Sequence, residues 1–203
     1  GAATATEGNS GTKAIAVPVT LSEPTTVPVS ATWHTLYAAG AAGNQATAGT
    51  DYVAASGTVT FAPGDTTATA SISVLGDTTT EPSEFVLLSF DPPTNATLGG
   101  YYGLGVATIA NDDAAPKIVP GSATMAEGNS GAKSIQIPVT LSNPSSKSVT
   151  ATWTTRFVVG GTGNQATAGT DYLTASGTVT FSPGQTSKFV SVKIVGDKVV
   201  EPS

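Results

Sequence analysis

Residues 56–75 have the sequence SGTVTFAPGDTTATASISVL. On both sides of the Pro63-Gly64 pair, apolar side chains alternate with small or polar ones, and this period of two is typical of half-buried β-strands. Proline followed by glycine favours a turn. The stretch therefore predicts a strand, a tight turn and a second strand, and it favours an all-β fold.

The same pattern continues on either side of this stretch. Residues 14–21 and 27–35 also alternate, and Pro- and Gly-rich turn signals separate the apolar runs. No stretch keeps a helical period for long. We predict a seven-strand antiparallel sandwich of immunoglobulin-like type, with Trp33 and its counterpart Trp153 facing the core. The predicted strands lie near residues 1–7, 14–21, 27–35, 57–61, 67–75, 84–90 and 104–111.

The chain contains an internal repeat with an offset of 120 residues. Residues 43–52 (GNQATAGTDY) return letter for letter as residues 163–172, and residues 7–83 match residues 127–203 at 45 of 77 positions. Two copies of one domain are therefore expected. The expected divisions are domain 1 at residues 1–113, a short linker at 114–116 and domain 2 at 117–203. Domain 2 is expected to be truncated, because it has no counterpart of residues 84–113.

Composition excludes several classes of protein. Only 22 of the 203 residues are charged (8 basic and 14 acidic), and the net charge of −6 argues against a nucleic-acid partner. The absence of cysteine excludes disulfides, thiolate nucleophiles and cysteine-based zinc sites. No apolar run approaches the length of a transmembrane helix, and residues 1–6 show no signal peptide.

The sequence also argues against an enzyme with a small-molecule substrate. His34 is the only histidine, and no cysteine is present. A catalytic triad of nucleophile, base and orienting group would therefore have to use this single, unpartnered histidine or one of the acids as its base. A glycosidase-like pair could be formed by Asp51 and Asp77, but it would need a sugar cleft with aromatic walls, and only 6% of the residues are aromatic. We therefore expect no catalytic activity.

Acidic residues are predicted to gather at one pole of each sandwich. Because residues 57–61 turn back into 67–75, Asp51 before the first strand and Asp77 after the second should lie at the same end. Tracing the other strands brings further acids to this pole. The predicted set is Glu7, Asp51, Asp77, Glu81, Asp112 and Asp113 in domain 1, and Glu127, Asp171, Asp197 and Glu201 in domain 2. Four acids are expected elsewhere: Glu23, Asp65, Glu84 and Asp91.

Such a concentration of negative charge predicts a bound cation. Mutual repulsion raises carboxyl pKa values or opens the loops unless a cation neutralises the charge. Ca²⁺ takes six to eight oxygen ligands and tolerates irregular loops, whereas Mg²⁺ demands a stricter octahedron. The alternative is that acids simply favour turns, but ten of the fourteen occupy the two predicted poles. Calcium is therefore the expected cofactor.

The ordered motifs resemble the Calx-beta domain. They are Glu-Gly-Asn-Ser-Gly from residue 7, Pro-Val-Thr-Leu-Ser from 18, Ala-Gly-Thr-Asp-Tyr from 48, Ser-Gly-Thr-Val-Thr-Phe-x-Pro-Gly from 56, Gly-Asp-x-x-x-Glu-Pro-Ser from 76 and Asn-Asp-Asp from 111. The resemblance covers essentially the whole chain. It implies an immunoglobulin-like sandwich of the kind found as calcium sensors in sodium/calcium exchangers, in integrin beta-4 and in tandem arrays of large surface proteins.

The resemblance also implies a ligand set. The family's calcium ligands match Glu7, Asp51, Asp77, Glu81 and the Asp112-Asp113 pair, the same six residues that the strand directions collect. One departure from the exchanger pattern is Gly76, which stands where the sensor domains carry an acidic run. Fewer ligands imply one or two ions and weaker binding, and domain 2 has no terminal Asp pair.

The expected function is that of a calcium-binding structural module. We expect a piece of an extracellular or cell-surface tandem-repeat protein, such as an adhesin, stalk or filament component, in which Ca²⁺ stiffens the domains and their junctions. The expected partners are neighbouring repeats. The alternative is a calcium-sensing regulatory domain of a larger membrane or signalling protein. A further hypothesis is that strands from another molecule complete domain 2.

Overall fold

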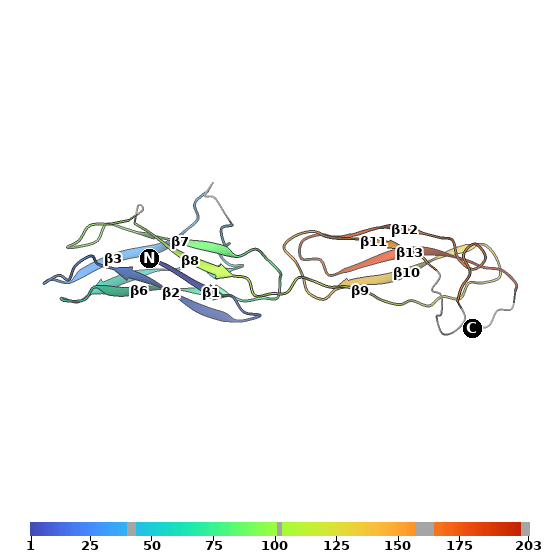
Figure 1. Cartoon of the computed structure of the whole chain (residues 1–203), viewed down its shortest axis with the longest axis horizontal. Coiled ribbons are helices and arrows are strands. Elements are labelled where there is room, and N and C mark those ends of the chain that lie inside the picture. The colour runs from blue at the N-terminus through green and yellow to red at the C-terminus, as the bar shows by residue number, and fades with distance from the viewer. Residues whose placement is uncertain (40–43, 101–102, 157–164, 200–203) are drawn as a thin grey trace. The chain divides into compact units, whose positions relative to one another are not determined.

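The computed structural model describes residues 1–39, 44–100, 103–156 and 165–199. The chain divides into two compact units, Gly1–Ala114 (unit 1) and Ala115–Ser203 (unit 2), and the regular elements in the described part are all strands (Figure 1). In that part, no helix is long and apolar enough to cross a membrane.

Unit 1 is a two-layer β-sandwich, as the sequence predicts. Its strands are β1 (Ala2–Thr6), β2 (Thr12–Thr20), β3 (Val29–Leu36), β4 (Tyr52–Val53), β5 (Ser56–Phe61), β6 (Thr67–Leu75), β7 (Glu84–Phe90) and β8 (Leu104–Ala110). One sheet has the order β1-β8-β7-β3-β5 and the other β2-β6-β4. All seven predicted strands are present, and the two-residue strand β4 is an addition in a segment predicted as loop. The all-β prediction is confirmed.

The first strand departs from the predicted antiparallel arrangement. β1 pairs with β8 in parallel, in a register from Ala2↔Val106 to Thr6↔Ala110. The physical reason is that β1 and the following β2 belong to different sheets. The chain therefore crosses between layers after Thr6 instead of forming a hairpin. As a result, β1 and β8 both end at the same edge of the sandwich.

Unit 2 repeats part of this architecture. Its strands are β9 (Ile118–Pro120), β10 (Ala132–Leu141), β11 (Val149–Thr154), β12 (Ser176–Phe181) and β13 (Ser187–Val195). They form the sheets β13-β10-β9 and β11-β12. The register of β10 with β13 reproduces that of β2 with β6 at the offset of 120 residues. The counterpart of β1, at residues 122–126, is not a strand. In unit 1 that strand pairs with β8, for which the described part of unit 2 has no equivalent.

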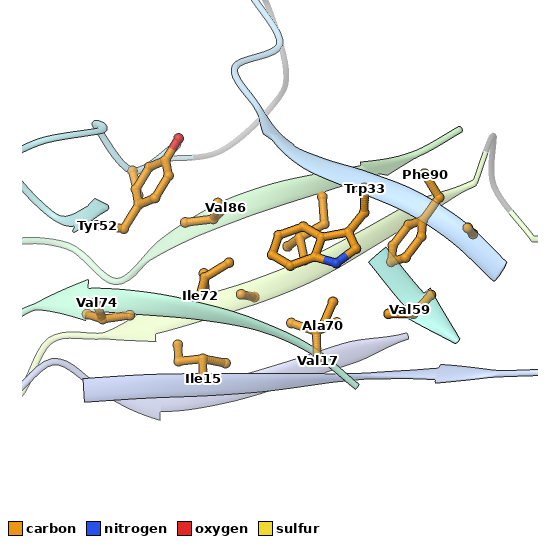
Figure 2. Close-up of a cluster of buried hydrophobic side chains, with 14 of the residues drawn as sticks. Ile15, Val17, Trp33, Tyr52, Val59, Ala70, Ile72, Val74, Val86 and Phe90 are labelled. Carbon is orange, nitrogen blue, oxygen red and sulfur yellow. The ribbon is translucent and has the colours of Figure 1, made fainter. Parts of the chain in front are cut away.

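The core of unit 1 lies between its two sheets (Figure 2). Trp33 on β3 is only 6% exposed and lies among Phe90, Val86 and Ile72 from strands of both layers. Leu88 and Val17, from opposite sheets, are fully buried. The predicted core position of Trp33 is confirmed.

The core of unit 2 is much smaller. Its buried apolar cluster consists of Val139, Leu141, Val179 and Phe181. Trp153, which is the counterpart of Trp33, is only half-buried. The prediction that it is buried in the core is therefore wrong for unit 2. The reason is that no strand in the described part of unit 2 corresponds to β7, on which the partner of Trp33 in the sheet lies.

Candidate metal centre

The parallel pairing of β1 with β8 brings the first and last acids of unit 1 together. Just beyond the paired strands, the Glu7 backbone N–H donates to the Ala110 carbonyl oxygen (3.2 Å). The next residue, Gly8, donates its N–H to Oδ1 of Asp112 (3.1 Å). Glu7 and Asp112 are 105 residues apart in sequence, yet the two strand ends hold them side by side.

Gly76 places Asp77 next to this pair. A Cβ at Gly76 would lie 2.3 Å from the carbonyl oxygen of Gly8 and 2.8 Å from that of Glu7, so only glycine fits here. The Gly76 N–H donates to the Gly11 carbonyl oxygen (3.0 Å), which fixes the approach. Gly76 therefore lets the chain leave β6 directly against Glu7.

Asp51 is held in place by hydrogen bonds from its own loop and from the end of β6. The Thr47 N–H donates to Oδ2 of Asp51 (2.5 Å). The carbonyl oxygen of Asp51 accepts a hydrogen bond from the Leu75 N–H at the end of β6 (2.9 Å). The side chain is only 7% exposed. The Thr47 N–H thus orients one carboxylate oxygen of Asp51, and the side chain is also hydrogen-bonded to Glu84.

Glu81, in the segment between β6 and β7, and Glu84, the first residue of β7, add two more carboxylates. The Glu81 N–H donates to Oδ1 of Asn111 (3.1 Å), and Nδ2 of Asn111 donates to the Asp113 carbonyl oxygen (3.1 Å). Asn111 therefore ties this segment to the end of β8. One carboxylate oxygen of each of Asp51, Glu81 and Glu84 lies within 4.8 Å of the others.

The structure thus brings together the six predicted acids of unit 1 and a seventh. Glu84, which was expected elsewhere, is the first residue of β7 and joins the cluster through Asp51 and Glu81. A sequence signal for it exists, because a strand that begins at the acidic pole places its first residue there. Glu23, Asp65 and Asp91 do not appear among the acids that affect the cluster.

Burial and mutual repulsion raise the pKa values of carboxyl groups in the cluster. Burial is the main reason that the pKa of Glu7 is raised to about 7. Burial, a hydrogen bond with Asp51 and repulsion from neighbouring carboxylates raise the pKa of Glu84 to about 8. The other charges that act on Glu7 all come from acids, namely Asp113, Asp77, Glu81 and Asp112.

Two buried oxygen atoms in this cluster have no protein partner. Burial and the neighbouring acids also raise the pKa values of Glu81 and Asp113. Oε1 of Glu7 and Oδ2 of Asp113 are buried without a hydrogen bond. A buried oxygen without a donor is costly unless it binds a cation. The cluster therefore offers hard oxygen ligands, net negative charge and unsatisfied lone pairs, which together suit Ca²⁺.

Unit 2 repeats the local supports of this pole. The Thr167 N–H donates to Oδ2 of Asp171 (2.5 Å), as Thr47 does to Asp51. Gly196 lies against the carbonyl oxygens of Glu127 and Gly128, so Asp197 follows the same path as Asp77. Glu201 lies outside the described residues. In the described part of unit 2 no acids correspond to Glu84, Asp112 or Asp113.

The pKa shifts predict how calcium-free unit 1 responds to pH. A carboxyl whose pKa is higher in the folded state than in the unfolded state stabilises the fold while protonated. For Glu7 and Glu84 this contribution is complete below about pH 4.5 and is lost as the pH rises through about 7 to 8. The melting temperature of calcium-free unit 1 should therefore fall by several degrees as the pH rises through this range.

Calorimetry in calcium-depleted buffer between pH 5 and pH 8.5 tests this prediction, with the unit 1 transition assigned from the fragment 1–116. The melting temperature should fall as the pH rises, and saturating Ca²⁺ should remove the fall because the bound ion favours the ionised carboxylates. A melting temperature that rises with pH in the absence of calcium would contradict the electrostatic account.

Comparison with known families identifies the class of protein. The sequence profile of the Calx-beta domain matches residues 40–113 and 112–203. The chain therefore belongs to the Calx-beta domain family. No curated protein matches it.

Three solved structures with Calx domains are similar to this chain. The calcium binding domain CBD12 of CALX1.1 is 19% identical, with a TM-score of 0.46, and the match covers 94% of this chain and 71% of that one. CBD12 from CALX1.2 is 22% identical, with a TM-score of 0.44 and coverages of 94% and 72%. The apo form of the Calx CBD1 domain is 24% identical, with a TM-score of 0.45 and coverages of 56% and 92%.

Proposed function

We propose that unit 1 is a non-catalytic calcium-binding module. The observation that supports this most directly is the buried side chain of Glu7, with Oε1 unpartnered and with other carboxylates as the charges around it. The proposed ligands come from the set Glu7, Asp51, Asp77, Glu81, Glu84, Asp112 and Asp113. Family membership and the acidic cluster support the same function independently.

The choice of Ca²⁺ follows from the number and placement of the oxygens. The acids come from four separate segments and approach one pole from different directions, which suits an ion that accepts six to eight ligands at irregular angles. Mg²⁺ keeps several of its waters and needs a near-ideal octahedron. The pole of unit 1 is therefore expected to discriminate in favour of calcium.

The second pole is proposed to be weaker. Glu127, Asp171, Asp197 and Glu201 would supply its protein ligands, and this chain offers no further acids equivalent to Glu84 and the Asp112-Asp113 pair. Fewer carboxylates mean less charge to attract the ion and a lower affinity. Unit 1 should therefore fill first in a titration.

The proposed role of the ion is mechanical. Asp112 and Asp113 lie at the end of unit 1, one residue before the boundary at Ala114–Ala115. A cation that holds these side chains against Glu7 would limit the freedom of the chain where it leaves the unit. Together with the internal repeat, this favours a spacer or stalk segment of an extracellular tandem-repeat protein, with neighbouring repeats as partners.

Titration calorimetry of the 203-residue chain with Ca²⁺ and with Mg²⁺ tests the proposal. We expect calcium binding in the micromolar to millimolar range, a higher melting temperature for unit 1 and little response to Mg²⁺. Replacing Asp112 and Asp113 together by asparagine should remove the calcium-dependent rise. An unchanged melting temperature at saturating calcium would refute the metal assignment. Submicromolar affinity with a large change of shape would instead favour the regulatory alternative.

A further inference from the structure

The two units carry opposite charge although they are copies of one domain. Residues 1–83 contain six acids and one lysine, whereas the matching residues 121–203 contain four acids and six basic residues. The formal net charge is therefore −5 in the first stretch and +2 in the second. Both stretches cover the same positions of the repeat, so the difference lies in the residues that the two copies do not share.

Four of the seven positions at which the charge differs lie at one end of each unit. We call it the turn end, since it consists of the turns at 21–28 and 62–66 in unit 1 and at 142–148 and 182–186 in unit 2. It lies at the opposite end of the strands from the acidic cluster. The four differences, in or beside these turns, are Glu23 to Asn143, Val27 to Lys147, Asp65 to Gln185 and Ala68 to Lys188.

The backbone of the turn end is the same in both units. In unit 1 the Gly64 N–H donates to the Thr25 carbonyl oxygen (2.8 Å), which holds the two turns side by side. In unit 2 the Gly184 N–H donates to the Ser145 carbonyl oxygen (2.9 Å), which is the equivalent bond. The two ends therefore present different charges on one common framework.

One of the exchanges removes a charge but keeps its structural contact. Oδ2 of Asp65 accepts a hydrogen bond from the Ala62 N–H (3.2 Å). In unit 2, Oε1 of Gln185 accepts the equivalent bond from the Ser182 N–H (3.2 Å). The turn therefore needs an oxygen at this position but no negative charge, so the fold does not explain why unit 1 carries an acid here.

Three lysines come together at the turn end of unit 2. Lys117 is tied to the first turn, because its N–H donates to Oγ of Ser142 (2.8 Å) and its carbonyl oxygen accepts from the Ser142 N–H (2.9 Å). Lys147 lies in the same turn, and Lys188 pairs with Val139, three residues before Ser142. Neither turn of unit 2 contains an acid. This end is therefore uniformly basic.

The turn end of unit 1 is acidic and has no base to compensate it. Glu23 and Asp65 are both exposed, and neither turn contains a lysine or an arginine. The single lysine of unit 1, Lys13, lies at the start of β2 at the other end, where its Nζ donates to Oγ1 of Thr6 (3.0 Å). Negative charge is therefore free to attract a basic partner at this surface.

We propose that the basic turn end of unit 2 binds the acidic turn end of unit 1 in a second copy of the chain. The occupant follows from charge complementarity, because each copy carries both signs at equivalent positions of the same framework. Exposed ion pairs are weak and are screened by salt, so the association is weak and depends on ionic strength. Both surfaces lie away from the acidic cluster, so the contact does not require calcium.

Sedimentation equilibrium of the 203-residue chain in calcium-free buffer tests the proposal. At about 200 µM chain and about 20 mM NaCl, we expect an average mass above that of the monomer, which returns to the monomer value at about 500 mM NaCl. A monomer at both salt concentrations would overturn the proposal. So would an association that is as strong at the higher salt concentration.

Replacements borrowed from the other unit remove one charged end at a time. Glu23→Asn with Asp65→Gln neutralises the turn end of unit 1, and Lys147→Val with Lys188→Ala removes most of the charge from that of unit 2. Each variant should associate at least about tenfold more weakly, the first even though its net charge changes only from −6 to −4 and so reduces general repulsion. An equimolar mixture of the two variants should associate again, because each retains the end that the other lacks. A mixture that stays monomeric would refute the proposed pairing.

The same exchanges at the other end of the units are the matched controls. Ser73→Lys with Thr78→Lys, and separately Lys193→Ser with Lys198→Thr, change the net charge by the same amounts with residues that the other unit already carries. Association should stay within about threefold of that of the unchanged chain. An equal loss in these controls would mean that overall charge governs the association, and it would overturn the assignment to the turn ends.

Discussion

Replacing Glu7 by glutamine is expected to stabilise calcium-free unit 1 at pH 8 and to weaken its calcium binding at the same time. At this pH the raised pKa of Glu7, about 7, means that the folded protein must hold a buried carboxylate among other carboxylates. Glutamine keeps the shape, removes the charge and offers an amide donor to those carboxylates. The melting temperature without calcium should rise by several degrees.

The same substitution removes a proposed ligand. Calcium affinity should fall by roughly ten- to hundredfold, because the site loses one negative charge and one oxygen that has no other partner. Glu84→Gln is expected to behave in the same way, since its pKa is raised to about 8. Thermal unfolding with and without calcium, combined with titration calorimetry, measures both effects.

Glu23→Gln is the matched control, since it removes an equal charge from an exposed residue outside the cluster. It should change neither the calcium-free stability nor the affinity by more than the error of the measurement. If Glu7→Gln destabilised the calcium-free protein, or left calcium affinity intact, the carboxylates would not be the repelling ligand set inferred above.

Trp33→Ala is expected to destabilise unit 1 by about 3–5 kcal/mol, and Trp153→Ala should destabilise unit 2 by much less. Trp33 is 6% exposed and enclosed from both sheets, so its removal leaves a cavity. Trp153 occupies the equivalent position but is only half-buried. The pair is a natural control, since residue type, strand and neighbouring glycine are the same in both units.

Denaturant unfolding of the two variants, followed by hydrogen exchange in each unit, measures this difference. A cost for Trp153→Ala equal to that for Trp33→Ala would mean that Trp153 is as fully enclosed as Trp33, and it would contradict this prediction.

Sequence reasoning predicted the strands and most of the acidic pole. The alternation at Ala70, Ile72 and Val74 has only one explanation, a sheet with one buried face, and all three residues are buried. The direction of successive strands then placed Asp51 and Asp77 at one end without any knowledge of side-chain positions. Local pattern and chain direction were sufficient for these features.

Other features depend on pairing between distant segments, which local pattern does not contain. Nothing in residues 2–6 distinguishes a parallel from an antiparallel neighbour, and the partner β8 lies about a hundred residues away. Glu84 was expected elsewhere because it begins a strand rather than occupying a loop. Trp153 was predicted to be buried because the residues around it match those around Trp33. The burial of Trp33, however, also depends on β7, which lies more than fifty residues away in the sequence.

The parallel pairing of β1 with β8 determines how unit 1 would bear a stretching force. β1 begins beside Val106 and ends beside Ala110, so a pull on Gly1 and an opposite pull on Asp113 act along neighbouring strands in opposite directions. The strands would have to slide past each other, and all five register pairs from Ala2 to Thr6 would share the load at once. Strands peeled apart from one end would break their bonds one by one. Unit 1 should therefore resist a force applied between its two chain ends more strongly than a force that peels β1 away from β8.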